Sequence, residues 1–314
     1  MPPLKGRSLL TLLDFSAEEI TALLDLADRV KRERVQRTHS RRFEGRTLAM
    51  IFEKRSTRTR CAFETSFGEE GGHPVFLAPG DIHLGEKESV EDTAKVLGRM
   101  FDCIEFRGYR QQTVETLAKY SGVPVYNGLT DLYHPTQVLA DLMTLRERFG
   151  SLVGKKISYV GDGRNNVARS LMIGCAKLGV HMTIGTPASL SPDQALLTAV
   201  RRSAEVTGSA ISVVDDPRTA VSGADAVYTD VWYSMGEEEK AAERIALLRP
   251  YQVNEDLMRA TGKPESVFLH CLPAVKGNEV VSSVIDGPQS AAWDEAENRK
   301  HTIKAIMLAT LGLD

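Results

Sequence analysis

The sequence predicts an α/β fold of two doubly wound parallel-sheet domains, with the functional site in the cleft between them. Strand-like apolar runs alternate with helical patterns along the chain, which is typical of parallel sheets joined by right-handed crossovers. The pattern forms two series, separated by a glycine-bounded segment at 150–154. A length of 314 residues is long for a single core and suits two domains of about 150 residues each.

The first domain is expected over residues 1–150, and it opens with a helix. Ser16 and Glu19 form a capping box just before apolar residues at helical spacing. Strands are then expected at 47–54, 74–79, 103–109 and 123–129. The helices that follow these strands are expected near 57–70, 89–101, 111–121 and 135–149. Glu69 and Glu70, at the end of the first of these helices, are expected on a solvated face.

The second domain is expected over residues 151–289. Its strands are expected at 155–162, 181–186, 210–216, 226–232 and 266–273, again with helices between them. A last helical stretch at 296–312 places Ile303, Ile306 and Met307 on one face and is compatible with packing on either domain.

Composition excludes several classes of protein. The net charge is −3 and the pI is near 6.2, which argues against a nucleic-acid-binding protein. No apolar run approaches the roughly 18 residues of a membrane span, and the N-terminal run is too short for a signal peptide. The four cysteines are scattered without metal-ligand spacing. We therefore expect reduced thiols, a cytoplasmic protein and no metal.

A local basic cluster stands out against this slightly acidic background. Lys54, Arg55, Arg58 and Arg60 fall within seven positions directly after the first predicted strand. Ser56 is a good N-cap, so a helix is expected to begin at about residue 57. The free main-chain N–H groups at a helix N-terminus bind phosphate. Hydroxyl side chains and the planar guanidinium of an arginine add further hydrogen-bond donors. The alternative, a capped helix with solvated arginines, is less favoured for this motif, so the sequence predicts a phosphate ligand.

In open parallel sheets, ligands bind outside the carboxyl ends of the strands. The segment 134–137, which contains His134 and Gln137, begins another helix at such an end, with Pro135 at its first position. A lone histidine is often structural, so a functional role for His134 is about as probable as a structural one.

The segment 161–166 resembles a dinucleotide-binding loop only weakly, because Asn166 replaces the third glycine. Asn165 and Asn166 could instead present amides to a polar zwitterion. Asp230 and Cys271 each lie at the end of a predicted strand of the second series. For Cys271, core filling and a functional role are equally compatible with the sequence.

Five motifs, S-T-R-T-R, F-R-G, H-P-T-Q, D-x-x-x-S-M-G and H-C-L-P, occur in this order. Together they closely resemble the ornithine carbamoyltransferases, within the aspartate/ornithine carbamoyltransferase family. The resemblance runs from about residue 5 to the C-terminus. It implies a carbamoyl-phosphate-binding domain at 1–150, completed by a C-terminal helix at 290–314, and an ornithine-binding domain at 151–289. It also implies a homotrimer or a multiple of trimers, and no cofactor.

The resemblance also implies roles for individual residues. The phosphate would be bound by Ser56, Thr57, Arg58 and Thr59. The carbamoyl group would contact Thr59, Arg107, His134, Gln137, Cys271, Leu272 and Arg299. Ornithine would be bound by Asn166, Asp230, Ser234 and Met235. His83 would also contact carbamoyl phosphate. It stands where the family often has Gln, in a loop expected to reach in from the neighbouring subunit.

The implied reaction is attack of ornithine's δ-amine on the carbonyl carbon of carbamoyl phosphate, giving citrulline and phosphate. Thr59, Arg107 and His134 would stabilise the oxyanion, and Asp230 and Cys271 would orient the amine. Three alternatives stay open. They are a relative that uses another amine, such as putrescine or an N-acylated ornithine, an NAD-dependent dehydrogenase, and a non-catalytic anion-binding protein.

Overall fold

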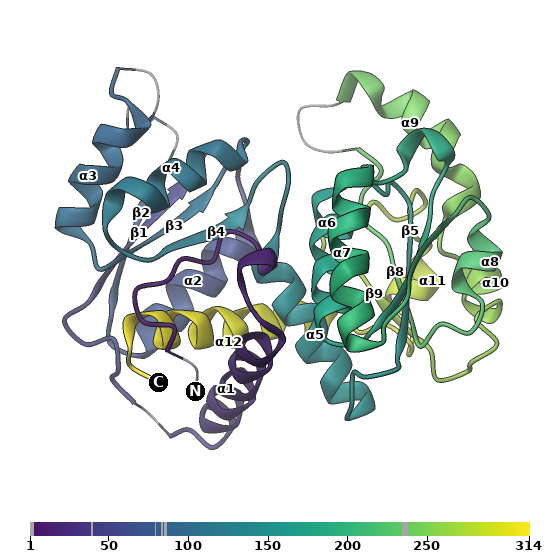
Figure 1. Ribbon diagram of the computed structural model, residues 1–314, viewed down its shortest axis with the longest axis horizontal. Helices are drawn as coiled ribbons and strands as arrows, with labels where there is room; N and C mark the ends of the chain where they lie inside the picture. The colour runs from purple at the N-terminus through teal and green to yellow at the C-terminus, as the bar shows by residue number, and fades with distance from the viewer. Residues whose placement is uncertain (1–2, 39, 79, 83, 85–86, 234–237) are drawn as a thin grey trace. The chain divides into compact units, whose positions relative to one another are not determined.

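The computed structural model describes residues 3–38, 40–78, 80–82, 84, 87–233 and 238–314. The chain divides into two compact units, which are described separately below. Unit 1 comprises Met1–Met143 and Glu297–Asp314, and unit 2 comprises Thr144–Ala296. Each contains a parallel sheet with helices on both faces (Figure 1), so the predicted two-domain α/β fold is confirmed. The boundaries between the two units lie within helices α5 (Pro135–Phe149) and α12 (Ala292–Leu311), each of which continues from one unit into the other. Neither boundary lies in the glycine segment at 150–154.

Unit 1 has a four-stranded sheet in the order β2-β1-β3-β4. The strands are β1 (Thr47–Phe52), β2 (His73–Leu77), β3 (Cys103–Arg107) and β4 (Val125–Leu129). All neighbours pair in parallel, as predicted. Apolar side chains such as those of Ile51, Phe106 and Val125 are buried around the sheet and form the core.

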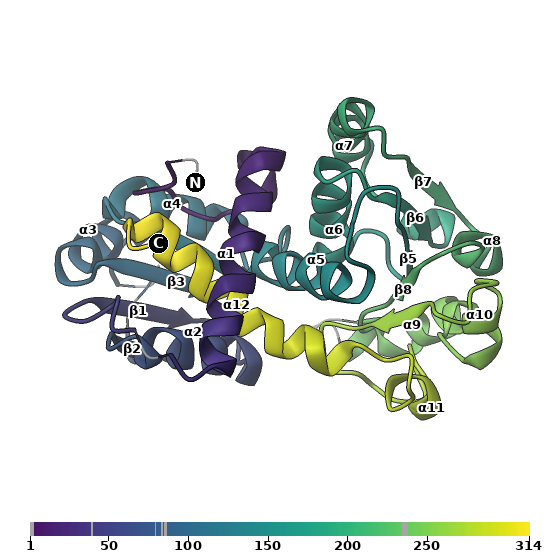
Figure 2. The same ribbon diagram turned by 90° about the horizontal axis from the view of Figure 1, so that it is seen from below.

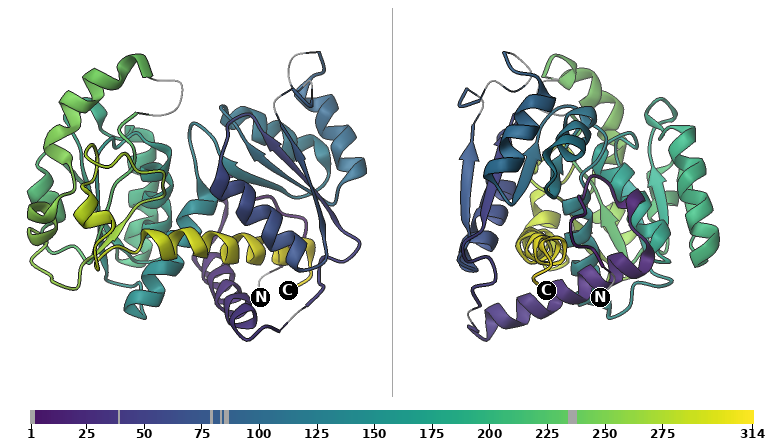
Figure 3. Two further views of the ribbon diagram at one scale, coloured as in Figure 1. Left: turned by 180° about the vertical axis from the view of Figure 1, so that it is seen from behind. Right: turned by 60° about the vertical axis from the view of Figure 1, so that its left-hand side comes forward.

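The other helices of unit 1 are α1 (Ala17–Val35), α2 (Thr57–Glu69), α3 (Val90–Met100) and α4 (Gln111–Ser121). Helices α3 and α4 cover one face of the sheet, and α2, α1 and the end of α12 cover the other (Figures 1 and 2). The predicted capping box of α1 is present, because Ser16 Oγ accepts from Glu19 N and Glu19 Oε2 accepts from Ser16 N. The segment around Gly6 lies beside the end of α12 (Figure 3), where Gly6 N donates to the carbonyl of Thr310 at 2.7 Å.

Unit 2 has a five-stranded parallel sheet in the order β7-β6-β5-β8-β9. The strands are β5 (Lys156–Val160), β6 (His181–Gly185), β7 (Ile211–Val214), β8 (Ala226–Tyr228) and β9 (Val267–Leu269). Its helices are α6 (Asn166–Lys177), α7 (Gln194–Thr207), α8 (Pro217–Val221), α9 (Ala241–Leu248), α10 (Glu255–Arg259) and α11 (Ser282–Ile285). Helices α6 and α7 cover one face, and α8 and α10 the other (Figures 1 and 2).

Several predicted strands are shorter than expected, and for two of them the difference matters for the site. Strand β8 ends at Tyr228 and β9 ends at Leu269, whereas strands were predicted to 232 and 273. The chain leaves the sheet there, so Asp230 and Cys271 lie just beyond the strand ends.

In the described residues no helix is long and apolar enough to cross a membrane, and no disulfide joins the four cysteines.

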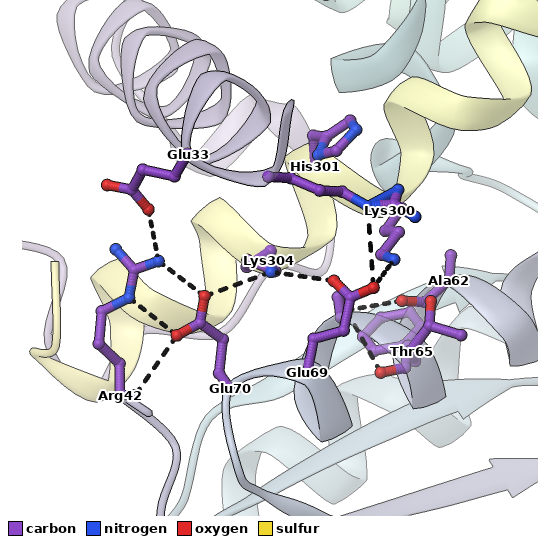
Figure 4. Close-up of polar contacts among 12 residues, drawn as sticks. Glu33, Arg42, Ala62, Thr65, Glu69, Glu70, Lys300, His301 and Lys304 are labelled. Carbon is purple, nitrogen blue, oxygen red and sulfur yellow. Dashed lines mark hydrogen bonds and ion pairs between the residues drawn. The ribbon is translucent and has the colours of Figure 1, made fainter. Parts of the chain in front are cut away.

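The expectation that Glu70 lies on a solvated face is wrong. Its side chain is buried within an ion-pair network that joins α1, α2 and α12 (Figure 4). Arg42 Nη2 lies 2.7 Å from both Glu70 Oε1 and Glu33 Oε2, and Lys304 Nζ lies 3.2 Å from Glu70 Oε1. Lys304 belongs to α12, at the other end of the chain. The local sequence around Glu70 therefore does not predict this ion pair. Glu69 is exposed, as predicted, and is paired with Lys300 and Lys304.

We expect Glu70→Gln to destabilise the protein and to flatten the acid side of its stability profile. Burial alone would raise the pKa of Glu70, but the hydrogen bonds from Arg42 and the charge of Lys304 outweigh it and hold the pKa below its ordinary value. A carboxylate with a depressed folded-state pKa contributes stability that is present above the unfolded pKa and lost as the pH falls through the folded pKa. Removing one partner of a buried ion pair costs about 3 kcal/mol at neutral pH.

Urea unfolding at pH 7 and near pH 4 measures both effects. Glu44→Gln is the matched control, because Glu44 pairs with Arg41 at 3.0 Å on the exposed surface, and it should behave like the wild type. A Glu70→Gln protein with the wild-type urea midpoint at pH 7 would show that the network contributes nothing to stability.

Candidate active site

Unit 1 presents its site residues where the strand order reverses, between β1 and β3. Ser56 caps α2, with its Oγ accepting from Thr59 N at 3.2 Å, and the helix begins at Thr57 as predicted. The first turn therefore offers main-chain N–H groups and a partial positive charge to an anion. Arg60 of the same motif is engaged elsewhere, because its Nε lies 3.2 Å from Glu64 Oε2 and its guanidinium lies 3.8 Å from the Phe76 ring centroid.

Two arginines donate hydrogen bonds to the buried hydroxyl of Thr59, at this point where the strand order reverses. Thr59 Oγ1 accepts from Arg299 Nη2 at 3.0 Å and from Arg107 Nη1 at 3.4 Å. All three side chains are at least nine-tenths buried. Arg107 ends β3, Thr59 lies in the first turn of α2 and Arg299 belongs to α12, so three elements converge on one atom. Two buried guanidiniums make this a strongly positive site.

The start of α5 adds further polar groups to the same cluster. Arg299 Nη1 donates to Gln137 Oε1 at 3.1 Å, and Gln137 Nε2 donates to Asp141 Oδ1 at 2.9 Å. Thr136 Oγ1 lies 3.4 Å from His134 Nδ1 and accepts from Arg299 Nη2 at 3.5 Å. Pro135 is the first residue of the helix, as predicted. The structure thus brings Thr59, Arg107, His134, Gln137 and Arg299 together.

The imidazole of His134 is held neutral. Burial lowers its pKa well below the ordinary value, and the positive charges of Arg299, Arg107 and Arg58 lower it further. A neutral imidazole carries one N–H, so His134 can donate a hydrogen bond to a substrate oxygen without adding charge. This favours a functional role for His134 over the purely structural one.

The sequence analysis missed Glu105, which lies in β3 two residues before Arg107 and is fully buried. Neither of its carboxyl oxygens has a hydrogen-bond partner in the described part of the chain. Burial raises its pKa well above the ordinary value, although Arg107 and Arg299 act in the opposite direction. An acidic residue inside an otherwise apolar strand was the available signal, because such residues are rarely buried without a reason.

Gly128 leaves the space that the Glu105 carboxyl occupies. The β3–β4 register shifts between Phe106 and Arg107, which pair with Asn127 and Leu129 and leave Gly128 as a bulge residue. A Cβ at Gly128 would lie 2.1 Å from Glu105 Oε1 and 3.1 Å from Thr59 Cγ2. A side chain here would therefore displace Glu105 and press on Thr59.

We expect Gly128→Ala to lower the free energy of unfolding by about 1–3 kcal/mol, the cost of overpacking a buried site. We also expect it to weaken phosphate binding, because Thr59 in the first turn of α2 would be displaced. Isothermal titration with inorganic phosphate measures the affinity. Gly68→Ala is the control, because a Cβ at that helical glycine meets nothing within 4 Å, and it should leave the affinity unchanged. Wild-type phosphate affinity in Gly128→Ala would contradict the assigned geometry.

Unit 2 gathers its polar residues at the equivalent place, between β5 and β8. Asp230 lies just beyond β8 and is buried. Its Oδ1 accepts from Cys271 Sγ at 3.1 Å, and its Oδ2 accepts from Asn165 Nδ2 at 2.9 Å. Cys271 is partly exposed and its thiol is hydrogen-bonded to a carboxylate. Both observations argue against the interpretation that Cys271 only fills the core. Asn166 is the first residue of α6.

The dinucleotide interpretation loses support here. Asn165 caps α6, with its side-chain oxygen accepting from Val167 N at 2.7 Å. That side chain satisfies a helix-terminal N–H group to which a pyrophosphate would bind. Asp162, in the same loop, is held by Arg244 at 3.0 Å.

His270 lies beside Asp230 and Cys271, and their possible ligand atoms fall within 4.8 Å of one another. However, His270 Nδ1 accepts from Leu272 N at 2.8 Å, and its Nε2 lies 3.3 Å from Glu279 Oε1. Because both ring nitrogens are engaged, a metal ion could bind this histidine only by displacing one of these hydrogen bonds.

The backbone of Leu272 is in the left-handed region, with φ at 59°, and such conformations concentrate at functional sites.

Three predicted site residues, His83, Ser234 and Met235, lie outside the described residues. The others divide between the units. Unit 1 holds Ser56, Thr57, Arg58, Thr59, Arg107, His134, Gln137 and Arg299, and unit 2 holds Asn166, Asp230, Cys271 and Leu272. The sequence analysis missed Thr136 and Asp141, whose roles depend on contacts with Arg299 and Gln137 from other parts of the chain.

Comparison with known proteins decides the family. The family profile described as aspartate/ornithine carbamoyltransferase, carbamoyl-P binding domain, matches residues 7–147. The profile for the Asp/Orn binding domain matches residues 153–310. The chain belongs to the aspartate/ornithine carbamoyltransferase family. The predicted family and the prediction of a transferase enzyme are therefore confirmed.

Individual relatives agree with this placement in the carbamoyltransferase family. The chain is 68% identical to an ornithine carbamoyltransferase from Pseudothermotoga lettingae, with 98% of each chain covered. It is 55% identical to a catabolic ornithine carbamoyltransferase from Bacillus licheniformis, covering 98% of this chain and 97% of that protein. The solved structure of ornithine carbamoyltransferase from Pyrococcus furiosus is 47% identical, covers 99% of both chains and superposes with a TM-score of 0.96.

Proposed function

We propose that this carbamoyltransferase transfers the carbamoyl group of carbamoyl phosphate to the δ-amine of L-ornithine, giving L-citrulline and phosphate. The observation that carries this proposal is the convergence of Arg107 and Arg299 on Thr59, beside the neutral His134 and the start of α2. Such an arrangement suits a phosphorylated ligand whose carbonyl oxygen gains negative charge during the reaction.

Unit 1 is proposed to bind carbamoyl phosphate, in agreement with the expected domain at 1–150 and 290–314. The phosphate lies at the N-terminus of α2, and Arg58 supplies a planar fork for two of its oxygens. Thr59, Arg107 and His134 donate to the carbamoyl oxygen, and each well-placed donor is worth about 3–4 kcal/mol in the transition state. The remaining proposed contacts are Ser56, Thr57, His83, Gln137, Cys271, Leu272 and Arg299.

Unit 2 is proposed to bind ornithine, in agreement with the expected domain at 151–289. Asp230 provides a carboxylate for a cationic amine, and Cys271 lies against the same oxygen. If the δ-amine has the pKa of lysine, about 10.4, freeing it at pH 7 costs roughly 4–5 kcal/mol. The free amine then attacks the carbonyl carbon, the bond from that carbon to the bridging phosphate oxygen breaks, and the departing phosphate takes up the proton that the attacking nitrogen loses. Asn166, Ser234 and Met235 are the other proposed contacts.

The test is product formation from purified protein, carbamoyl phosphate and a panel of amines. The panel contains L-ornithine, putrescine, an N-acylated ornithine, L-aspartate and L-lysine. We expect citrulline and phosphate in equal amounts with L-ornithine, and far less product with the other amines. Asp230→Asn is the control that should lose activity with every amine. A higher kcat/KM with any other amine would contradict the proposed substrate.

We also propose that the working enzyme is a cytoplasmic homotrimer or a multiple of trimers. Most soluble oligomers of one chain are closed and symmetric, and the family resemblance favours a threefold arrangement. Analytical ultracentrifugation at catalytic concentrations tests this proposal, and a protein that is fully active as a monomer would contradict it.

A further inference from the structure

Asn165 bridges helix α6 and the acidic group of unit 2. Its Oδ1 accepts from Val167 N at 2.7 Å, and its Nδ2 donates to Asp230 Oδ2 at 2.9 Å. A main-chain N–H can only donate, so the amide oxygen must face the helix and the amide nitrogen must face Asp230. The helix start therefore fixes which way the amide points.

The two oxygens of Asp230 are held differently. Oδ1 accepts from Cys271 Sγ at 3.1 Å and from Val231 N at 2.8 Å. In the described part of the chain, Asn165 supplies the hydrogen bond to Oδ2 and no other residue does so. Without this hydrogen bond, the carboxylate would be held only at Oδ1, and Oδ2 could move.

We propose that Asn165 is a positioning residue that fixes the Asp230 carboxylate for the amine of the substrate by tying it to the start of α6. This inference rests on the proposed function of Asp230. It differs from two simpler interpretations. In one, Asn165 only caps the helix, and in the other its amide binds the substrate directly. The second fits the geometry less well, because the amide oxygen and one N–H are already used.

Two substitutions separate capping from positioning, because Ser and Asp both cap helices as well as Asn. Asn165→Ser keeps the cap but is too short to bond Asp230. Asn165→Asp keeps the cap but sets a second carboxylate against Asp230, and neighbouring carboxylates raise one another's pKa. Asn254→Ser is the matched control. Asn254 caps α10 in the same unit, accepting from Leu257 N at 2.9 Å.

We expect Asn165→Ser to raise the KM for ornithine about tenfold or more, which is the usual effect of losing a hydrogen bond to a charged group. The KM for carbamoyl phosphate and the melting temperature should stay close to those of the wild type. In Asn165→Asp, the acid limb of the pH profile for ornithine should move to higher pH. Asn254→Ser should change none of these quantities.

A substrate-independent measurement keeps this inference separate from the proposed function. The carbon NMR signal of the labelled Asp230 carboxyl group, recorded without substrate at neutral pH, should shift in Asn165→Ser because the hydrogen bond to Oδ2 is lost, and it should stay in place in Asn254→Ser. If the wild type forms no citrulline, the proposed function fails, and this signal alone decides the role of Asn165. An unchanged signal in Asn165→Ser would overturn the inference. So would equal losses for both substrates accompanied by a lower melting temperature.

Discussion

Arg58→Lys should lower kcat/KM for carbamoyl phosphate by about 100-fold while leaving the fold intact. Lysine keeps the positive charge but loses the planar pair of N–H donors that matches two phosphate oxygens. Loss of one or two charge-assisted hydrogen bonds costs about 2–3 kcal/mol, and 1.4 kcal/mol is a factor of ten. The site would still have the N–H groups of α2, so binding should weaken without disappearing.

The same motif provides the control for this experiment. Arg60 lies two residues further along α2, but it pairs with Glu64 and stacks on Phe76, so Arg60→Lys should change kcat/KM by less than about twofold. Steady-state kinetics give both values, and circular dichroism checks the fold. Equal losses in the two variants would mean that the cluster acts through its total charge and that Arg58 has no special position.

His134→Phe should reduce kcat by about 100- to 1,000-fold, the usual effect of removing one donor to a developing oxyanion. Phenylalanine keeps an aromatic ring in the buried position, so packing should largely survive. His73→Phe is the control, because His73 is exposed at the start of β2. A kcat within about threefold of the wild type in His134→Phe would remove this histidine from the proposed mechanism.

The neutral state of His134 also predicts a pH dependence of stability. Its folded-state pKa lies well below the ordinary value because of burial and three neighbouring arginines. Below about pH 6.5 the unfolded chain binds a proton that the folded chain does not, so stability falls as the pH drops through this range. In urea unfolding between about pH 7 and pH 5, His134→Phe should show a smaller loss of stability than the wild type. An equal loss would mean that the folded protein protonates His134 normally.

Much of the fold and site follows from local patterns. Each predicted strand is present, because buried parallel strands read as apolar runs, and helix starts at Ser16, Ser56 and Pro135 are set by their own local sequence. The strand-end rule selected Asp230 and Cys271, which lie just beyond β8 and β9 and are joined by a hydrogen bond. Local patterns work here because the relevant contacts are close in the chain or are imposed by sheet topology.

What could not be predicted depends on partners distant in sequence. Glu70 is buried because Lys304 packs over it, and Glu105 fits because a bulge places Gly128 opposite it. A register shift leaves no trace in hydrophobic periodicity. The orientation of Asn165 is fixed only by combining its role as a helix cap with the position of Asp230 just beyond another strand.

The composition of unit 1 has a consequence for protein synthesis. This unit takes Met1–Met143 from the beginning of the chain and Glu297–Asp314 from its end. The ribosome therefore synthesises all of the contiguous unit 2 before the piece that completes unit 1 has been translated, although domains usually finish folding in the order of their synthesis. Arg299, whose guanidinium donates to Thr59 and Gln137, lies in this second piece. A chain terminated before residue 299 lacks the guanidinium, so it cannot form the contacts that join α12 to α2 and α5.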